Sequence, residues 1–135
     1  MPRTRLIATV LTAAIAAASL TAPAHAGGSI SIGIQPGSAK AERAMRAGFG
    51  LYSLVNGISS GASIRQLGTG NSGGIAQNGG GNRGIVHQEG SGHTGTLEQN
   101  GNNNAYGLFQ FGRGTNAGIV QNGYGGTGAT VVYGW

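Results

Sequence analysis

Cysteine and aspartate are both absent from this chain of 135 residues, and charged residues make up only 8% of it. Without cysteine no disulfide can hold a small domain together, so its stability must come from another source, such as repetition or polymerisation. Without aspartate the calcium-binding solenoids are excluded, because their repeats place Asp at a fixed position. The three carboxylates that remain are Glu42, Glu89 and Glu98. With so few acidic groups we expect no enzyme activity, including that of a polysaccharide-cleaving β-helix enzyme, and no cofactor.

Histidine and the basic residues are also too few or too scattered to form a familiar site. His93 stands where the pattern described below has Asn, and we interpret it as a tolerated variant in a turn and not as a metal ligand. No lysine of the Walker type follows any glycine run. Of the six Lys and Arg residues after residue 26, three fall within residues 40–46. No basic stripe runs along the chain, so nucleic-acid binding is not expected.

Residues 1–26 have the pattern of a secretory signal peptide. Arg3 and Arg5 make a short basic start, an apolar Ala-rich run covers residues 6–20, and small residues at 24 and 26 form a cleavage signal. The alternative is a membrane anchor, but the apolar run is short for a spanning helix. The sequence therefore predicts a signal peptide over residues 1–26, a secreted product, and no integral membrane segment after cleavage.

A strict 11-residue repeat occupies residues 60–135. Six glutamines recur at this step, each with Gly two residues later and a branched aliphatic residue two residues earlier. The glycines are Gly68, Gly79, Gly90, Gly101, Gly112 and Gly123, and the aliphatic residues are Ile64, Ile75, Val86, Leu97, Leu108 and Ile119. A disordered Gly/Asn-rich segment is the alternative on composition alone. The constant phase over six copies favours ordered repeats.

The spacing inside the repeat predicts one short strand and one tight turn for each unit. The marked positions lie two residues apart, as on one face of a β-strand, and glycine reaches the positive φ that a tight turn needs. Two units make a 22-residue coil, and one coil cannot bury its inner face alone. We therefore expect an all-β fold, a parallel β-solenoid of strand–turn–strand coils that becomes cross-β amyloid on assembly.

Stacked coils would bring the repeated polar residues into columns. Amides can hydrogen-bond to like amides above and below them, so the glutamines are expected to form two inward ladders that support polymerisation. One ladder consists of Gln66, Gln88 and Gln110, and the other of Gln77, Gln99 and Gln121. A second inward column of small or polar residues contains Ser60, Asn71, Asn82 and Asn104.

Residues 27–59 form a separate N-terminal segment. Alternating Ser and Ile after Gly28 predict a strand, followed by a turn at Pro36. Ser38 is a good N-cap for a short helix that we expect to end at Gly48 and Gly50. Residues 49–55 are then interpreted as a degenerate first strand, with Val55 at the Gln position, just as Val132 occupies it at the other end. The helix could be a secretion signal, a cap, a partner site or only a solvated face.

The repeat resembles that of the curlin family, the subunits of curli fibres. The family pattern S-x5-Q-x-G-x-G-N-x-A-x3-Q is matched from Ser60 to Gln77, with Gly73 in place of its Ala. Later copies depart from it, because Asn replaces Ser at 82 and 104, and His93 and Thr115 replace Asn. The resemblance covers about residues 60–135, with about three full 22-residue repeats.

The resemblance implies a function and a set of partners. The implied function is to form a homopolymeric amyloid fibre in a biofilm matrix at the bacterial cell surface, after export through an outer-membrane pore. The implied partners are that pore, periplasmic accessory proteins, and a related curli subunit or nucleator. An alternative from another class is a minor nucleating or adhesive subunit that uses exposed Phe109, Phe111, Tyr124 and Tyr133. A monomeric carbohydrate- or ice-binding solenoid ranks lower, because its outer face would have to be flat and regular.

Overall fold

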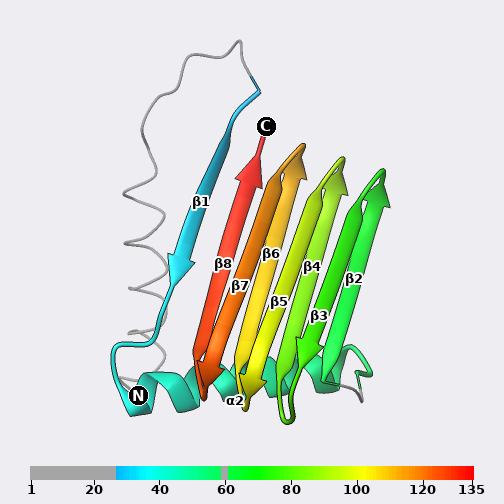
Figure 1. Cartoon of the computed structure of the whole chain (residues 1–135). Coiled ribbons are helices and arrows are strands. Elements are labelled where there is room, and N and C mark those ends of the chain that lie inside the picture. The colour runs from blue at the N-terminus through cyan, green and yellow to red at the C-terminus, as the bar shows by residue number, and fades with distance from the viewer. Residues whose placement is uncertain (1–26, 59–60) are drawn as a thin grey trace.

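The computed structural model describes residues 27–58 and 61–135, which form one helix and eight strands (Figure 1). The expected signal peptide and the place of Ser60 in its column lie outside these residues. The elements are β1 (Ser29–Ile34), α2 (Ala39–Val55), β2 (Ala62–Thr69), β3 (Ser72–Asn78), β4 (Arg83–Ser91), β5 (Thr94–Asn102), β6 (Ala105–Arg113), β7 (Asn116–Tyr124) and β8 (Thr127–Gly134).

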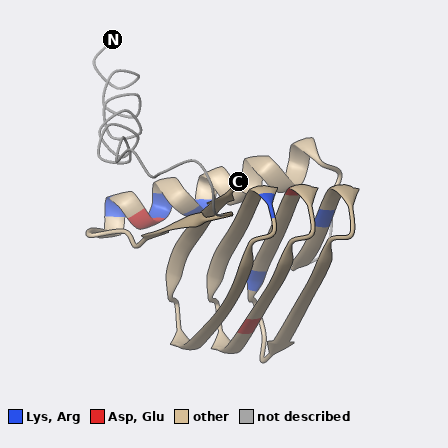
Figure 2. Ribbon diagram, turned by 90° about the horizontal axis from the view of Figure 1, so that it is seen from above, with Lys and Arg blue, Asp and Glu red and all other residues tan. Residues whose placement is uncertain are grey.

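The repeat strands alternate between two sheets. Sheet A has the order β1-β8-β6-β4-β2, and sheet B has the order β3-β5-β7. Strands β2 to β8 pair in parallel with the same offset throughout, so that Gln66 lies beside Gln88 and Gln77 beside Gln99. The predicted β-solenoid with 22-residue coils is therefore confirmed. Figure 2 shows α2 along one side of the strands, which carry few charged residues.

The main core lies between the two sheets. Val86, Leu108 and Val132 of sheet A pack against Leu97 of sheet B, and each is at most 2% exposed. Small residues in the same layer let the sheets approach each other. A Cβ atom on Gly84, for example, would lie 3.0 Å from both the Leu97 and the Gln99 side chains. Val132 lies beside Gln110, so the degenerate copy at the C-terminal end occupies the expected place in the stack.

The repeated glycines lie in the last residues of the strands, or directly after them at Gly79, just before the corners of the coils. They have positive φ, from 86° at Gly112 to 128° at Gly90. At all of them except Gly123, a Cβ atom would also collide with the backbone of the next coil. At Gly68 it would meet the carbonyl oxygen of Gly90, and the same collision recurs one coil further on. Both the backbone conformation and the close spacing of the coils therefore require glycine at this position.

Helix α2 is longer than the sequence predicts, and this overturns the expected strand over residues 49–55. Ser38 is the N-cap, accepting a hydrogen bond from the Ala41 amide at 3.1 Å, but the helix continues through Gly48 and Gly50 to Val55. A glycine inside a helix costs about 1 kcal/mol relative to alanine. Packing outweighs that cost, because Phe49 is only 6% exposed against the outer face of sheet A.

Strand β1 forms as expected, but its position does not follow the repeat. It pairs antiparallel with β8, with Ile32 opposite Val131. It is therefore the last strand of sheet A, on the side away from β2. All six of its residues are exposed.

Candidate assembly site

The inward glutamines form two continuous hydrogen-bonded ladders. In sheet A the Gln66 amide nitrogen donates to Gln88 Oε1, and Gln88 donates to Gln110 Oε1, both at 2.8 Å. In sheet B, Gln77 donates to Gln99 at 2.8 Å and Gln99 to Gln121 at 2.9 Å. Gln88, Gln99 and Gln110 are fully buried. The structure therefore brings together all six glutamines that the sequence indicates, three in each sheet.

The ladder amides inside the stack also connect the two sheets. Gln88 Nε2 donates to the carbonyl oxygen of Ser72 at 2.8 Å, and Gln99 Nε2 donates to that of Arg83 at 3.0 Å. The acceptor is in each case the first residue of a strand in the opposite sheet. Among the described residues no buried side-chain nitrogen or oxygen lacks a hydrogen-bond partner. The buried part of the ladders consequently leaves no polar group without a partner, which is a condition for placing amides in a core.

The asparagine column links the corners of successive coils. Asn82 Nδ2 donates to the Gly101 carbonyl at 2.8 Å, and its Oδ1 accepts from the Asn104 amide at 3.1 Å. Asn71 and Asn104 make equivalent pairs of bonds. Each asparagine side chain thus ties its own corner to the backbone of the next coil through two hydrogen bonds.

His93 takes an asparagine's place in this column and is fully buried, not simply a turn residue. Its Nδ1 lies 2.8 Å from Thr115 Oγ1, and its Nε2 lies 3.2 Å from the Glu89 carbonyl oxygen. The ring therefore provides two polar atoms, as the amide does elsewhere. The buried histidine was not anticipated, although its position in the repeat could have indicated it.

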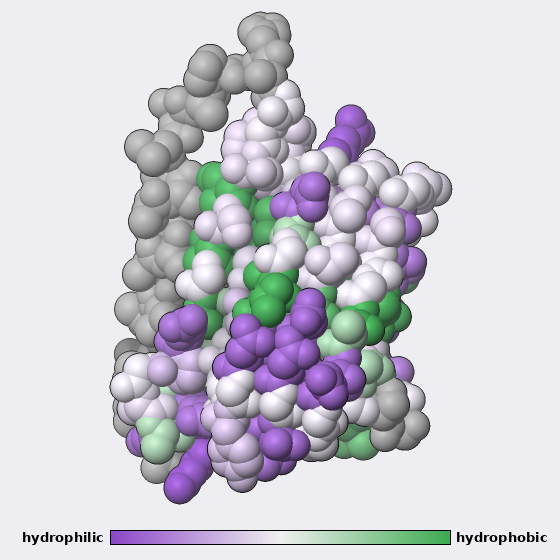
Figure 3. Space-filling view, in the orientation of Figure 1, coloured by the Kyte–Doolittle hydropathy of each residue, from purple (hydrophilic) through white to green (hydrophobic). Residues whose placement is uncertain are grey.

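The ends of the stack are edges of the two sheets. Among the described strands, β2 and β3 have a neighbouring strand on one side only, and β7 has one only on the opposite side. On β2 the core-facing Ile64 is 42% exposed, whereas its equivalent Val86 is completely buried. Figure 3 shows apolar surface gathered on the β1 side of the molecule, next to hydrophilic surface. Such edges are templates for pairing with another chain.

The ladders are directional, and each end has the opposite hydrogen-bonding character. In all four bonds the lower-numbered glutamine donates and the higher-numbered one accepts. Within the described residues, Gln66 Oε1 and Gln77 Oε1 accept no hydrogen bond, and Gln121 Nε2 donates none. One end of the stack therefore offers acceptors and the other end offers a donor.

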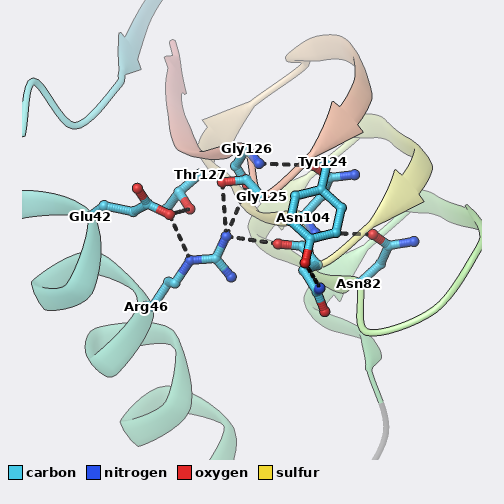
Figure 4. Close-up of polar contacts among 9 residues, drawn as sticks. Glu42, Arg46, Asn82, Asn104, Tyr124, Gly125, Gly126 and Thr127 are labelled. Atoms are coloured by element: carbon cyan, nitrogen blue, oxygen red, sulfur yellow. Dashed lines mark hydrogen bonds and ion pairs between the residues drawn. The ribbon is translucent and has the colours of Figure 1, made fainter. Parts of the chain in front are cut away.

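Arg46 fastens α2 to the corners of the coils (Figure 4). Its guanidinium donates to the carbonyl oxygens of Asn103 at 2.7 Å and Gly125 at 3.1 Å, which belong to two successive corners. Glu42 orients the guanidinium from one helical turn away, with the Arg46 Nε 3.1 Å from Glu42 Oε1. The same oxygen accepts from the Thr127 hydroxyl at 3.3 Å. The cationic face of the helix is thus partly a docking surface.

An aromatic cluster extends this docking. The Tyr52 hydroxyl lies 2.6 Å from His87 Nδ1, and the Tyr52 ring packs edge-on against Phe109. Burial raises the pKa of Tyr52 above its ordinary value, and the charge of Arg65 opposes part of that increase. Phe109 and Phe111 are therefore half-buried, and only Tyr124 and Tyr133 of the proposed adhesive aromatics are exposed, at 77% and 55%.

The described residues do not form a metal site. In residues 27–58 and 61–135 no three side chains of His, Cys, Asp or Glu come together as a bound metal ion would require. Within those residues α2 is too short and too polar to cross a bilayer. Comparison with models of protein families, with curated proteins and with solved structures finds no match to this chain. The function proposed below therefore rests on the arrangement of this chain's own residues.

Proposed function

We propose that the protein is a secreted structural subunit that assembles into extracellular, curli-like amyloid fibres. The observation that supports this most strongly is the chemistry of the two ends of the solenoid. The contact that joins one coil to the next inside the chain is offered again, unfilled, by β2 and β3 at one end and by β7 at the other. A second copy can therefore continue the stack with the interactions that the first copy uses internally.

The driving force for this addition comes from backbone pairing and from the core. Adding a coil pairs one of the edge strands β2, β3 or β7, buries residues such as Ile64, and extends an amide ladder. Burial of apolar surface contributes about 25 cal/mol per Å². Cross-β assemblies combine the same interactions over many chains, which is why they are so stable.

The setting of this assembly is proposed from the resemblance to curlin repeats. In this setting the subunit is exported through an outer-membrane pore with the help of periplasmic accessory proteins. It then forms a homopolymer in a biofilm matrix at the bacterial cell surface. A related subunit or nucleator would start the fibre. Tyr124 and Tyr133, both exposed, favour a second candidate, in which this chain is the minor adhesive or nucleating subunit.

Assembly of the purified chain lacking residues 1–26 tests the main proposal. We expect fibres that bind thioflavin T and give a meridional reflection at about 4.7–4.8 Å. A chain that stays monomeric for weeks at high concentration would contradict the proposal. A seeding assay then separates the two candidates, because a nucleator accelerates a related subunit at low molar ratio, whereas a major subunit elongates its own fibres.

A further inference from the structure

The end of the stack at β7 and β8 is stepped, because sheet A continues past the last strand of sheet B. Beyond β6, sheet A adds β8 and β1, whereas sheet B ends at β7. A hollow of about 700 Å³ lies in this step. It is lined by residues 118–122 of β7, by Tyr106, and by the corner that precedes β8. The hollow lies where the next strand of sheet B would be.

We propose that this step receives β2 of a second copy, which is rotated by half a turn about the axis along which the coils stack. Strand β1 leaves β8 when the second copy docks. This proposal rests on the proposed assembly function. The described chain has seven repeat strands, four in sheet A and three in sheet B, so the next strand of the series belongs to sheet B. A half-turn carries a strand from the position of sheet A to that of sheet B and reverses its direction. Strand β2 of the second copy would therefore run parallel to β7.

The side chains of β2 match those of β7 in this arrangement. Within the chain each strand pairs with the strand one coil later, as Gln99 pairs with Gln121. Continuing that register across the joint places Ile64 of the second copy beside Ile119, and its Gln66 beside Gln121. The unused nitrogen of Gln121 then faces the unused oxygen of Gln66. The sheet B ladder continues into the second copy with the same direction of donation.

Gly123 supports the same position for the next strand. Its φ of 117° is almost that of Gly101, 118°, so its backbone has the conformation found inside the stack. At Gly101 an added Cβ would collide with the carbonyl oxygen of Gly123 in the next coil, but at Gly123 nothing lies within 4 Å of that point. The space that the next coil occupies elsewhere is open here.

Strand β1 lies where the same second copy would place its β3. It covers β8 through an antiparallel ladder of six residue pairs, and Ile30, Ile32 and Ile34 remain 36–41% exposed. Docking would exchange this ladder for two parallel ladders, β2 on β7 and β3 on β8. The exchange gains one strand pairing and buries the stepped end. Strand β1 is thus a cap that a second copy can displace.

An arrangement without the half-turn is less favourable. In that case β2 of the second copy would replace β1 on β8, and the place above β7 would stay empty. The backbone groups along β7 would then lie unpaired inside the fibre, and unpaired peptide groups in a buried place are unfavourable. The half-turn leaves no such gap. It also puts α2 of successive copies on opposite sides of the fibre, because α2 covers only sheet A.

Pairs of cysteines distinguish the two arrangements, because the chain has no cysteine of its own. With the half-turn, Arg65 of one copy lies beside Val120 of the other, so the variant R65C/V120C should form disulfide-linked multimers. Without it Arg65 lies beside Val131, so R65C/V131C should do so instead. Neighbouring strands are about 4.8 Å apart, within the Cα range of a disulfide. Fibres are grown in reductant, oxidised, dissolved and analysed on a denaturing gel.

The expected result is multimers from R65C/V120C and none from R65C/V131C. The reverse pattern, or fibres in which neither pair forms multimers, would overturn the half-turn while leaving the proposed function standing. Absence of fibres from the unaltered chain would count against the proposed function itself. The outcomes of the two proposals are therefore distinguishable.

The displacement of β1 needs its own test. The variant I30C/Y133C joins opposite residues of β1 and β8, and its oxidised form should elongate at least tenfold more slowly than its reduced form. The matched control N78C/N100C joins β3 to β5, which stay paired in the fibre, so oxidation should leave its rate unchanged. If the oxidised I30C/Y133C chain elongates at the reduced rate, β1 is not a displaceable cap.

Discussion

Replacing Gln99 by alanine should destabilise the monomer strongly, because Gln99 is fully buried in the middle of the sheet B ladder. Its side chain accepts from Gln77 and donates to Gln121 and to the Arg83 carbonyl. Three hydrogen bonds at about 1 kcal/mol each, together with the space left by the side chain, predict a loss of about 3–5 kcal/mol. That is a large part of the roughly 5–15 kcal/mol that is usual for a domain.

The assay for Gln99→Ala is urea unfolding of freshly prepared monomer at low concentration. The matched control is Asn78→Ala, an exposed amide whose side chain makes no hydrogen bond among the described residues and which should cost less than about 0.5 kcal/mol. The same pair should differ in fibre growth, with only Gln99→Ala slowing it. Equal unfolding midpoints for the two variants would refute the assignment of the ladder as a structural element.

Three further predictions follow from the contacts described above. Gly101→Ala should greatly weaken the monomer through collision with Gly123, whereas Gly123→Ala should weaken it less and mainly slow elongation, as unfolding and thioflavin T kinetics would show. Arg46→Met should raise hydrogen exchange across α2, whereas Arg43→Met, at an exposed position without such bonds, should not. Because burial raises the pKa of Tyr52 above 10.0, the unfolded chain loses that proton first. Stability should then fall as the pH rises above about 10, and less steeply in Tyr52→Phe, which pH-dependent unfolding can measure.

The position of α2 changes how the N-terminal segment is understood. Sequence propensity ends the helix at Gly48, because two glycines in three residues weaken a helix in isolation. Met45, Phe49 and Tyr52, spaced four and three residues apart, place one apolar face on sheet A. This spacing was the available signal in the sequence. The alternation of apolar residues with glycine and serine in residues 49–55 also fits a strand. Contact of this face with Ile85 and Ala105 of sheet A favours the helix instead.

The sequence by itself determined the coil. The 11-residue phase predicts strands, corners, register and the separation of alternate glutamines into two ladders, because each of these depends on local periodicity and on stacking like upon like. Only the tertiary structure decided how the ends of the stack are finished. The pairing of β1 with β8 and the docking of α2 on sheet A depend on contacts between segments far apart in the chain, outside the repeat. No periodicity encodes such contacts, so the step beside β7, which we propose as the place where the next copy docks, could be found only from the folded chain.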